Sequence, residues 1–210
     1  MSTLSYVSEV LMLVAVIVSI IILYRLLKQI GINTITKPKK ELISLEKDAY
    51  CNAEVQRMLI RIKLELHACK VLFARFHNGG CYANGLDMKK HTVTHETAGG
   101  TFHNDSLMDK CVGILNSRYG IGFEILAATH QYVVSDSEDC LDSNFKADMG
   151  RHGFKSCYLF LIKQRDGIDE GFIGVNFKET MVLTAEQRDI VLEQIPRLLD
   201  LINMKENRFN

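Results

Sequence analysis

Residues 75–105 carry most of the side chains that could do chemistry. The candidates for a binding site are Arg75, His77, Asn78, Tyr82, His95 and Glu96. An arginine offers a forked set of donors to a carboxylate or phosphate, and the other groups could orient a polar ligand in an otherwise apolar pocket. The region therefore predicts a site for a small polar ligand. The alternative is that Arg75 and Glu96 only pair with each other across adjacent strands.

Histidine is frequent in the same region, which makes zinc ligation a second hypothesis. His91 and His95 flank Thr92-Val93-Thr94, whose β-branched residues favour a strand. In a regular strand both imidazoles point the same way but lie about 13 Å apart, at ~3.3 Å per residue, too far for one tetrahedral ion. We predict no metal; a site built from His77, Cys81 and His95 across two paired strands is the alternative.

Catalysis has little support in the sequence. A nucleophilic cysteine needs a neighbouring base, and the candidate pair is Cys81 with His77, which are close only in sequence. The Gly-Gly pairs at 79–80 and 99–100 lack the spacing and the lysine of a phosphate-binding loop. We therefore predict no catalytic residue and no enzyme, and the sequence identifies no cofactor.

The charges of the 210-residue chain are unevenly distributed. It holds 25 basic and 25 acidic residues, and a net charge of zero argues against a nucleic-acid partner. Residues 1–40 contain five basic residues and one acid, which leaves 20 basic and 24 acidic residues in 41–210. The sequence thus divides into a basic N-terminal flank and a mildly acidic domain.

Residues 1–28 are predicted to form a transmembrane anchor. Val10–Tyr24 carries no charge, and with its apolar neighbours it is long enough, at about 20 residues, to cross a bilayer. Arg25 and Lys28 follow the span, and the linker 29–40 adds three lysines, whereas the first nine residues contain no basic group. The positive-inside rule then places the N-terminus outside and the soluble domain in the cytoplasm, with the lipid bilayer as a partner.

A long helix is predicted over residues 41–69. Its apolar strip, Val55, Leu59, Ile62 and Leu66, has the spacing of one helix face. This strip either packs in the core of the domain or forms the seam of a homodimer. We take the dimer interface as the working prediction.

Alternating or continuous apolar runs predict strands after this helix. They cover 71–77, 88–97, 156–162 and 171–177, while 123–128 and 131–135 are strands or strand ends. Asn78-Gly79-Gly80 is a strong turn signal that should end the first strand. Four or five largely antiparallel strands with helices on one face give an α+β domain.

The C-terminal region carries the clearest local signals. Thr184 and Gln187 have the spacing of a capping box that begins a last helix, and Pro196 should kink that helix. Tyr158–Ile162, Gly171–Val175 and Leu183–Gln187 together resemble the GAF family of sensory domains, with residues 41–205 covered and 206–210 left as a tail. The block from Arg75 to Asn84-Gly85 also shows a weaker likeness to small GAF-like proteins of tailed bacteriophages.

The resemblance implies a GAF-like antiparallel sheet of six strands, with long first and last helices on one face. It also implies dimerisation through those helices and a small-molecule pocket on the other face of the sheet. The cyclic-nucleotide-binding pattern of the family is not recognisable, so that ligand is not implied. We expect a membrane-anchored cytoplasmic sensory or regulatory module that binds a small polar ligand or a partner protein as a homodimer. The alternatives are a zinc- or thiol-dependent enzyme on the same fold and a phage-encoded membrane effector that contacts host proteins.

Overall fold

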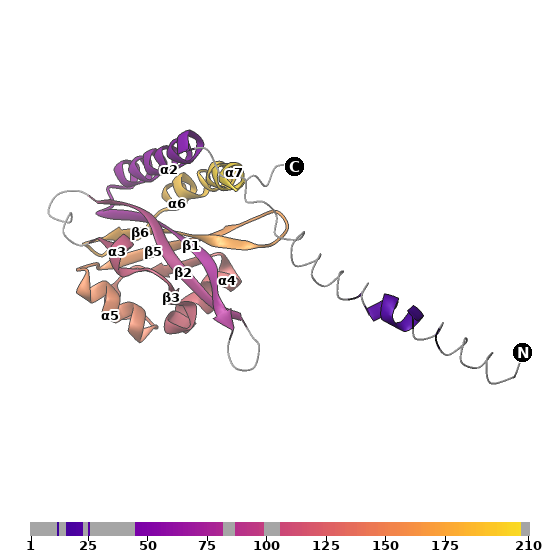
Figure 1. Ribbon diagram of the computed structural model, residues 1–210. Coiled ribbons are helices and arrows are strands. Elements are labelled where there is room, and N and C mark those ends of the chain that lie inside the picture. The colour runs from indigo at the N-terminus through magenta and orange to yellow at the C-terminus, as the bar shows by residue number, and fades with distance from the viewer. Residues whose placement is uncertain are drawn as a thin grey trace, which may run out of the picture. The chain divides into compact units, whose positions relative to one another are not determined.

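The computed structural model describes residues 12, 16–22, 25, 45–81, 87–98 and 106–206 (Figure 1). The chain divides into two units, residues 1–42 and residues 43–210. The described residues of the first unit are helical, but most of the predicted anchor and all of the linker 29–40 lie outside the described residues. Within the described part of the chain, no helix has the length and apolar character that a membrane span requires.

The second unit is built on a six-stranded antiparallel sheet with the strand order β3-β2-β1-β6-β5-β4. The strands are β1 (Lys70–Cys81), β2 (Asp87–Ala98), β3 (Ile114–Leu115), β4 (Gln131–Val134), β5 (Ser156–Lys163) and β6 (Asp169–Phe177). The two hairpins β1–β2 and β5–β6 meet along the β1–β6 pairing in the middle of the sheet. The predicted α+β class is confirmed, and so are the six strands that the family resemblance implies; the count of four or five from the apolar runs was too low.

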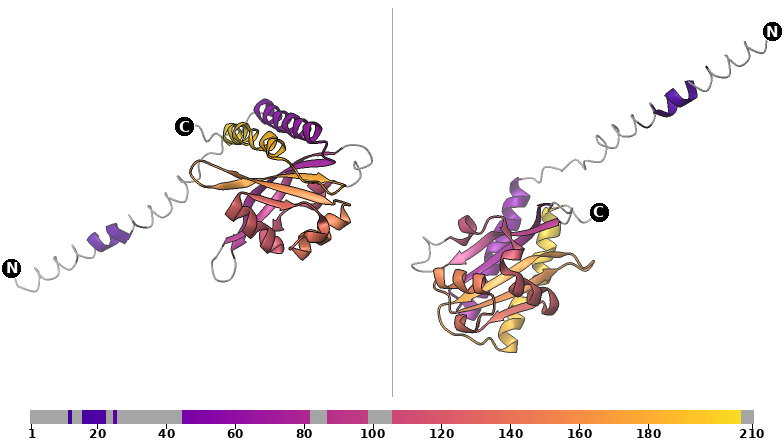
Figure 2. Two further views of the ribbon diagram at one scale, coloured as in Figure 1. Left: turned by 180° about the vertical axis from the view of Figure 1, so that it is seen from behind. Right: turned by 90° about the horizontal axis from the view of Figure 1, so that it is seen from below.

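Helices cover both faces of this sheet (Figures 1 and 2). One face carries α2 (Leu45–Leu66), α6 (Ala185–Leu192) and α7 (Ile195–Lys205). The other face carries α3 (Leu107–Lys110), α4 (Gly120–Thr129) and α5 (Ser143–Arg151), with the short 3-10 turns η2 (Asn116–Tyr119) and η3 (Ser137–Asp139) between them. Two separate hydrophobic clusters, one for each face, fill the space between helices and sheet.

The inner face of α2 is the strip that was predicted as a dimer seam. Leu59, Ile62 and Leu66 have no exposed surface, and Val55 is 4% exposed. All four belong to the cluster that α2, α6 and α7 form with the sheet. The dimer-interface prediction for this strip is therefore wrong, because the chain's own sheet and C-terminal helices already cover it.

The C-terminal predictions are confirmed with one change. The hairpin β5–β6 pairs as expected, and Thr184 and Gln187 form a reciprocal capping box at the start of α6. Pro196 does more than kink the last helix: α6 ends at Leu192, and α7 begins at Ile195 with the proline in its first turn. Proline is tolerated there because the first turn of a helix has no partner for its N–H.

Two local predictions are wrong. β1 continues through Asn78-Gly79-Gly80 to Cys81 because the pairing with β2 resumes after a register shift; the glycines absorb that irregularity, and Gly80 has a positive φ of 110°. Residues 123–128, predicted as a strand, belong to α4, which buries Gly122 and Leu126 against the sheet. A short apolar run does not distinguish a strand from a buried helix.

Candidate functional site

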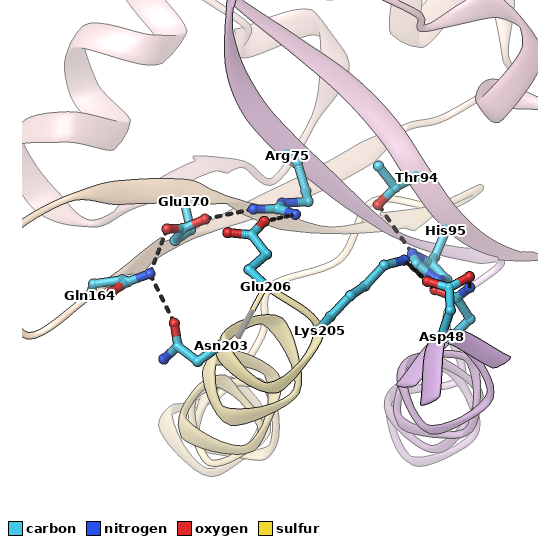
Figure 3. Close-up of polar contacts among 10 residues, drawn as sticks. Asp48, Arg75, Thr94, His95, Gln164, Glu170, Asn203, Lys205 and Glu206 are labelled. Atoms are coloured by element: carbon cyan, nitrogen blue, oxygen red, sulfur yellow. Dashed lines mark hydrogen bonds and ion pairs between the residues drawn. The ribbon is translucent and has the colours of Figure 1, made fainter. Parts of the chain in front are cut away.

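Arg75, the predicted anion-binding residue, lies on the face of β1 that α2 and α7 cover, and its charge is already neutralised. Its guanidinium forms ion pairs with Glu170 at 2.9 Å and with Glu206, directly after α7, at 2.6 Å (Figure 3). Gln164 extends this arrangement by donating to Glu170 and to Asn203 of α7. Two carboxylates surround one arginine, so the site repels a further anion. Arg75 Nε is buried without a hydrogen-bond partner among the described residues, but the charge is compensated.

His95 lies in the same layer, between the sheet and the helices. Its ring stacks on Phe73 at a centroid distance of 6.1 Å, and its Nδ1 lies 3.1 Å from Thr94 Oγ1. Burial, together with the nearby ammonium of Lys205, lowers the pKa of His95 to about 4. Lys205 itself pairs with Asp48 of α2 at 2.7 Å (Figure 3). We call these groups, Asp48, Arg75, His95, Glu170, Lys205 and Glu206, the helix-side polar layer; they connect the sheet to α2 and α7.

Glu96 faces the other side of the sheet and has a structural role. Its Oε2 lies 3.5 Å from the ammonium of Lys70, which has no exposed surface, and accepts the backbone N–H of Leu107 at 2.9 Å. Because Leu107 is the first residue of α3, the carboxylate satisfies a donor at the start of that helix. Arg75 pairs with Thr92 in the ladder, and Glu96 pairs with Leu72. The Arg75–Glu96 pair, the alternative to a ligand site, is therefore absent.

A β-bulge at Thr94 explains why these residues separate. Phe73 pairs with His95 and the next residue, Ala74, pairs with Val93, so Thr94 is an extra residue on β2. One extra residue moves every following side chain to the opposite face. His91 therefore faces α4 while His95 faces α2, and the prediction that both point the same way is wrong.

Three of the predicted binding residues, Arg75, His77 and Asn78, line one cavity of about 580 Å³ at the end of β1. There His77 Nε2 lies 2.9 Å from Thr92 Oγ1, and Asn78 Oδ1 accepts from Lys89 at 3.1 Å. We call it the side cavity. Its polar groups are engaged with one another, so it offers a ligand few free partners. Tyr82 lies outside the described residues.

The metal hypothesis gains no support. His95 on β2 pairs with Phe73 on β1, and His77 lies four residues further along β1. At ~3.3 Å per residue, the two histidines are about 13 Å apart. The side chain of Cys81 lies outside the described residues. Among the described side chains, no group of three His, Cys, Asp or Glu residues has the arrangement of a metal site.

A second cavity, of about 460 Å³, lies between the sheet and the helices α3, α4 and α5; we call it the central cavity. Its floor comes from neighbouring strands and includes Leu72, Val93, Leu159, Phe172 and Asn176. Its other walls come from α3 to α5 and the segments that connect them. A mostly apolar space of this volume with a few polar groups has the size and character of a small-molecule site.

Aromatic rings form one wall of the central cavity. His91, Phe123 and Phe172 meet with centroid distances of 5.3 to 5.7 Å, and Tyr119 lies 5.9 Å from His91. Burial lowers the pKa of His91, although its hydrogen bond to Asn116 opposes this shift. At neutral pH the His91 ring is therefore uncharged and acts as one more flat surface.

Charged groups gather at one part of the cavity wall around Asp148. This carboxylate pairs with Arg118 at 3.3 Å and with Arg151 at 2.7 Å, and it accepts a hydrogen bond from the Tyr119 hydroxyl at 2.5 Å. Burial and this hydrogen bond raise the pKa of Tyr119, so the phenol stays protonated. The single carboxylate of Asp148 therefore pairs with two guanidinium groups, which leaves this group with a net positive charge.

Asn176 supplies a polar group to the floor. It is 4% exposed, and its Nδ2 has no hydrogen-bond partner among the described residues. Its backbone carbonyl is occupied, since it accepts the N–H of Cys69 at 3.0 Å. Buried amides are almost always paired, so this donor marks a position where a partner is missing.

Three described cysteines are poorly suited to nucleophilic catalysis. Burial raises the pKa of Cys69, Cys111 and Cys157. A reactive cysteine requires the opposite shift, toward the thiolate. Cys111 and Cys157 line the central cavity, where they act as small apolar groups.

Comparison with solved structures identifies the fold. The phycocyanobilin-bound GAF domain of a cyanobacterial phytochrome superposes with a TM-score of 0.60 and 14% identity over 83% of this chain and 100% of that chain. The chain has a GAF fold. A far-red cyanobacteriochrome photoreceptor gives a TM-score of 0.58 and 12% identity, over 87% of this chain and 98% of that chain. A type II free methionine-R-sulfoxide reductase from Thermoplasma acidophilum gives 0.53 and 11%, over 75% and 95%.

The likeness is one of structure alone. No family profile matches the sequence, and the search of curated proteins finds no match either. The neighbours include light sensors and a reductase, so the fold by itself is compatible with several functions. The weaker likeness to bacteriophage proteins finds no support in these comparisons.

The central cavity could not be found from the sequence. Its walls come from nearly the whole domain, from Leu72 to Asn176. Tyr119 and Phe123 are four residues apart, but that spacing is typical of any helix that packs on a sheet. The prediction concentrated on polar residues of the β1–β2 hairpin. Among the described polar side chains of that hairpin, only His91 lines the central cavity.

Proposed function

We propose that this protein is a sensory or regulatory module whose GAF-fold domain binds a small molecule in the central cavity. The observation that carries the proposal is the cavity itself, about 460 Å³ in volume and lined by rings on one wall. A domain without a ligand would gain stability by filling this volume with its own side chains.

The second part of the proposal is a membrane anchor. The apolar run Val10–Tyr24 and the basic residues after it support a span with the domain on the cytoplasmic side. A cysteine added before residue 10 should react with a membrane-impermeant maleimide on intact cells, whereas one added after residue 206 should not. Labelling of both ends, or of the C-terminal one alone, would contradict this topology.

The strand β6 could transmit a change in the central cavity to α2, the first helix of the domain. β6 presents Phe172 to the central cavity and the alternate residues Ile173 and Val175 to the cluster beneath α2 and α7. A ligand that displaces β6 would therefore act directly on α2, the helix that follows the juxtamembrane linker. The helix-side polar layer supplies a second connection between the same elements.

A binding screen tests the proposal. Thermal unfolding of the full chain in lipid nanodiscs would be measured with and without a library of cellular metabolites, and a ligand should raise the midpoint of the wild type. Cys111→Trp places a large ring in the central cavity and should abolish the shift. Val133→Trp, on the exposed side of the edge strand β4, is the matched control and should keep it. Equal shifts in both variants would place the site elsewhere.

A further inference from the structure

We infer that the ligand of the central cavity is a planar ring compound with two polar ends: a hydrogen-bond acceptor that meets Asn176 at the floor and an anionic group that meets Arg118 and Arg151 at the outer end. This inference rests on the proposed function, since it specifies the chemistry of the same site. Three independent features of the cavity, one for each part of the ligand, carry it.

The inner end is specified by the amide of Asn176. Only 4% of the residue's surface is exposed, and Nδ2 has no hydrogen-bond partner among the described residues. The side chain of Lys70, its ladder partner on β1, ends in an ammonium, which is a donor only and lies 3.5 Å from Glu96 Oε2. A buried donor left without a partner is costly, and a carbonyl or ring nitrogen of a ligand would complete it.

The middle of the ligand is specified by rings. His91, Phe123 and Phe172 contact one another at centroid distances between 5.3 and 5.7 Å, and Tyr119 continues the wall. Faces and edges of these rings are the surfaces against which another flat ring packs best. An aliphatic chain would gain burial there but none of the ring–ring geometry.

The outer end is specified by an excess of positive charge. Arg118 and Arg151 have 41% and 64% of their side-chain surface exposed, so they stand where the cavity meets solvent, and both pair with the single carboxylate of Asp148. The guanidinium of Arg118 also lies 5.6 Å from the centre of the Tyr119 ring. A second anion, supplied by the ligand, would balance this group, and arginine binds carboxylates and phosphates in two-pronged fashion.

Other ligand classes fit less well. A purely apolar molecule would fill the volume but leave the Asn176 amide unpaired. A cation would meet two arginines for one carboxylate. A metal ion lacks ligands, since the described side chains contain no group of three metal-binding residues.

Three synthetic probes separate these contributions. They are 6-acetyl-2-naphthoate, which has ring, ketone and carboxylate; 2-naphthoate, which lacks the ketone; and 6-acetyl-2-naphthamide, which lacks the charge. Affinities for the full chain in nanodiscs would be measured by titration calorimetry with empty nanodiscs as the blank. The variants are Asn176→Leu, Arg151→Gln and, as a charge control outside the cavity, Lys163→Gln.

The ketone should strengthen binding to the wild type by about 5- to 10-fold, the worth of one net hydrogen bond, and this gain should vanish in Asn176→Leu. The carboxylate should strengthen binding several-fold at low salt. That gain should shrink in Arg151→Gln and persist in Lys163→Gln. Both results together support the inference.

Several results would overturn it. The ketone could give the same gain in Asn176→Leu as in the wild type, or the amide could bind as tightly as the acid. Absence of binding by all three probes would also reject this ligand class. The metabolite screen with Cys111→Trp decides separately whether the cavity binds another molecule, so the proposed function can stand when the inferred class fails.

Discussion

Replacing Asn176 by leucine should make the ligand-free domain more stable. A buried polar group without a partner costs about 1–3 kcal/mol, and leucine keeps the branched shape of asparagine without a polar atom, although its two methyl groups take up more volume. Imperfect fit of the new methyl groups offsets part of the gain. We therefore expect an increase of about 1–2 kcal/mol, or ~2–8 °C in Tm for a domain of about 150–250 residues.

The assay is thermal unfolding of wild type and variant, followed by circular dichroism in the same nanodiscs at pH 7. Asn116→Leu is the matched control, because Asn116 Oδ1 lies 2.9 Å from Nδ1 of the buried His91. Removing that partner should lower stability by about 1–3 kcal/mol, since the imidazole nitrogen is left buried and unpaired. The same chemical change should therefore have opposite signs at the two positions.

A loss of stability in Asn176→Leu similar to that in Asn116→Leu would refute the reasoning. It would mean that the Asn176 amide is satisfied within the protein. The cavity would then give no reason to expect a hydrogen-bond acceptor at the inner end of the ligand. An unchanged Tm would mean that water reaches the amide at little cost.

The remaining predictions concern packing, pH and the anchor. Gly171→Ala should destabilise the domain by about 3 kcal/mol or more, because the new Cβ would lie 2.0 Å from a backbone oxygen of β1; Gly150→Ala, which meets no atom within 4 Å in α5, should be neutral or slightly stabilising in the same melts. The pKa of His95 is about 4 in the folded protein against an ordinary 6.5, so the unfolded chain binds more protons between these pH values and stability falls as the pH drops through this range. His95→Gln should flatten that part of a Tm-versus-pH curve, and a slope equal to that of the His77→Gln control would contradict the assignment. Deleting residues 1–30 should release a folded domain from the membrane fraction, and an aggregated product would count against the anchor.

The elements that were predicted correctly depend on signals between near neighbours. The capping box of Thr184 and Gln187 needs only a spacing of three residues, and the hairpin β5–β6 is evident from two apolar runs with a turn between them. The buried face of α2 follows from helical spacing, but its partner does not. A helix strip looks the same whether it packs on its own sheet or on a second chain.

The candidate site was mispredicted for one main reason. A single extra residue, Thr94, reverses the faces of β2, so His91 and His95 separate and Glu96 does not face Arg75. Bulges of this kind have no reliable signature in a single sequence, because the extra residue is recognised only against the partner strand. Arg75 likewise loses its predicted role through Glu170 and Glu206, which are far from it in the chain.

The sequence by itself therefore determined the division into a basic apolar flank and an acidic α+β domain, the terminal hairpin and the start of the last helical region. These features arise from composition and from interactions over a few residues. The tertiary structure alone decided which face each side chain of the β1–β2 hairpin occupies, which groups neutralise Arg75, and where the central cavity lies. Each of these depends on strand register or on residues that can be more than a hundred positions apart, which only the folded chain brings together.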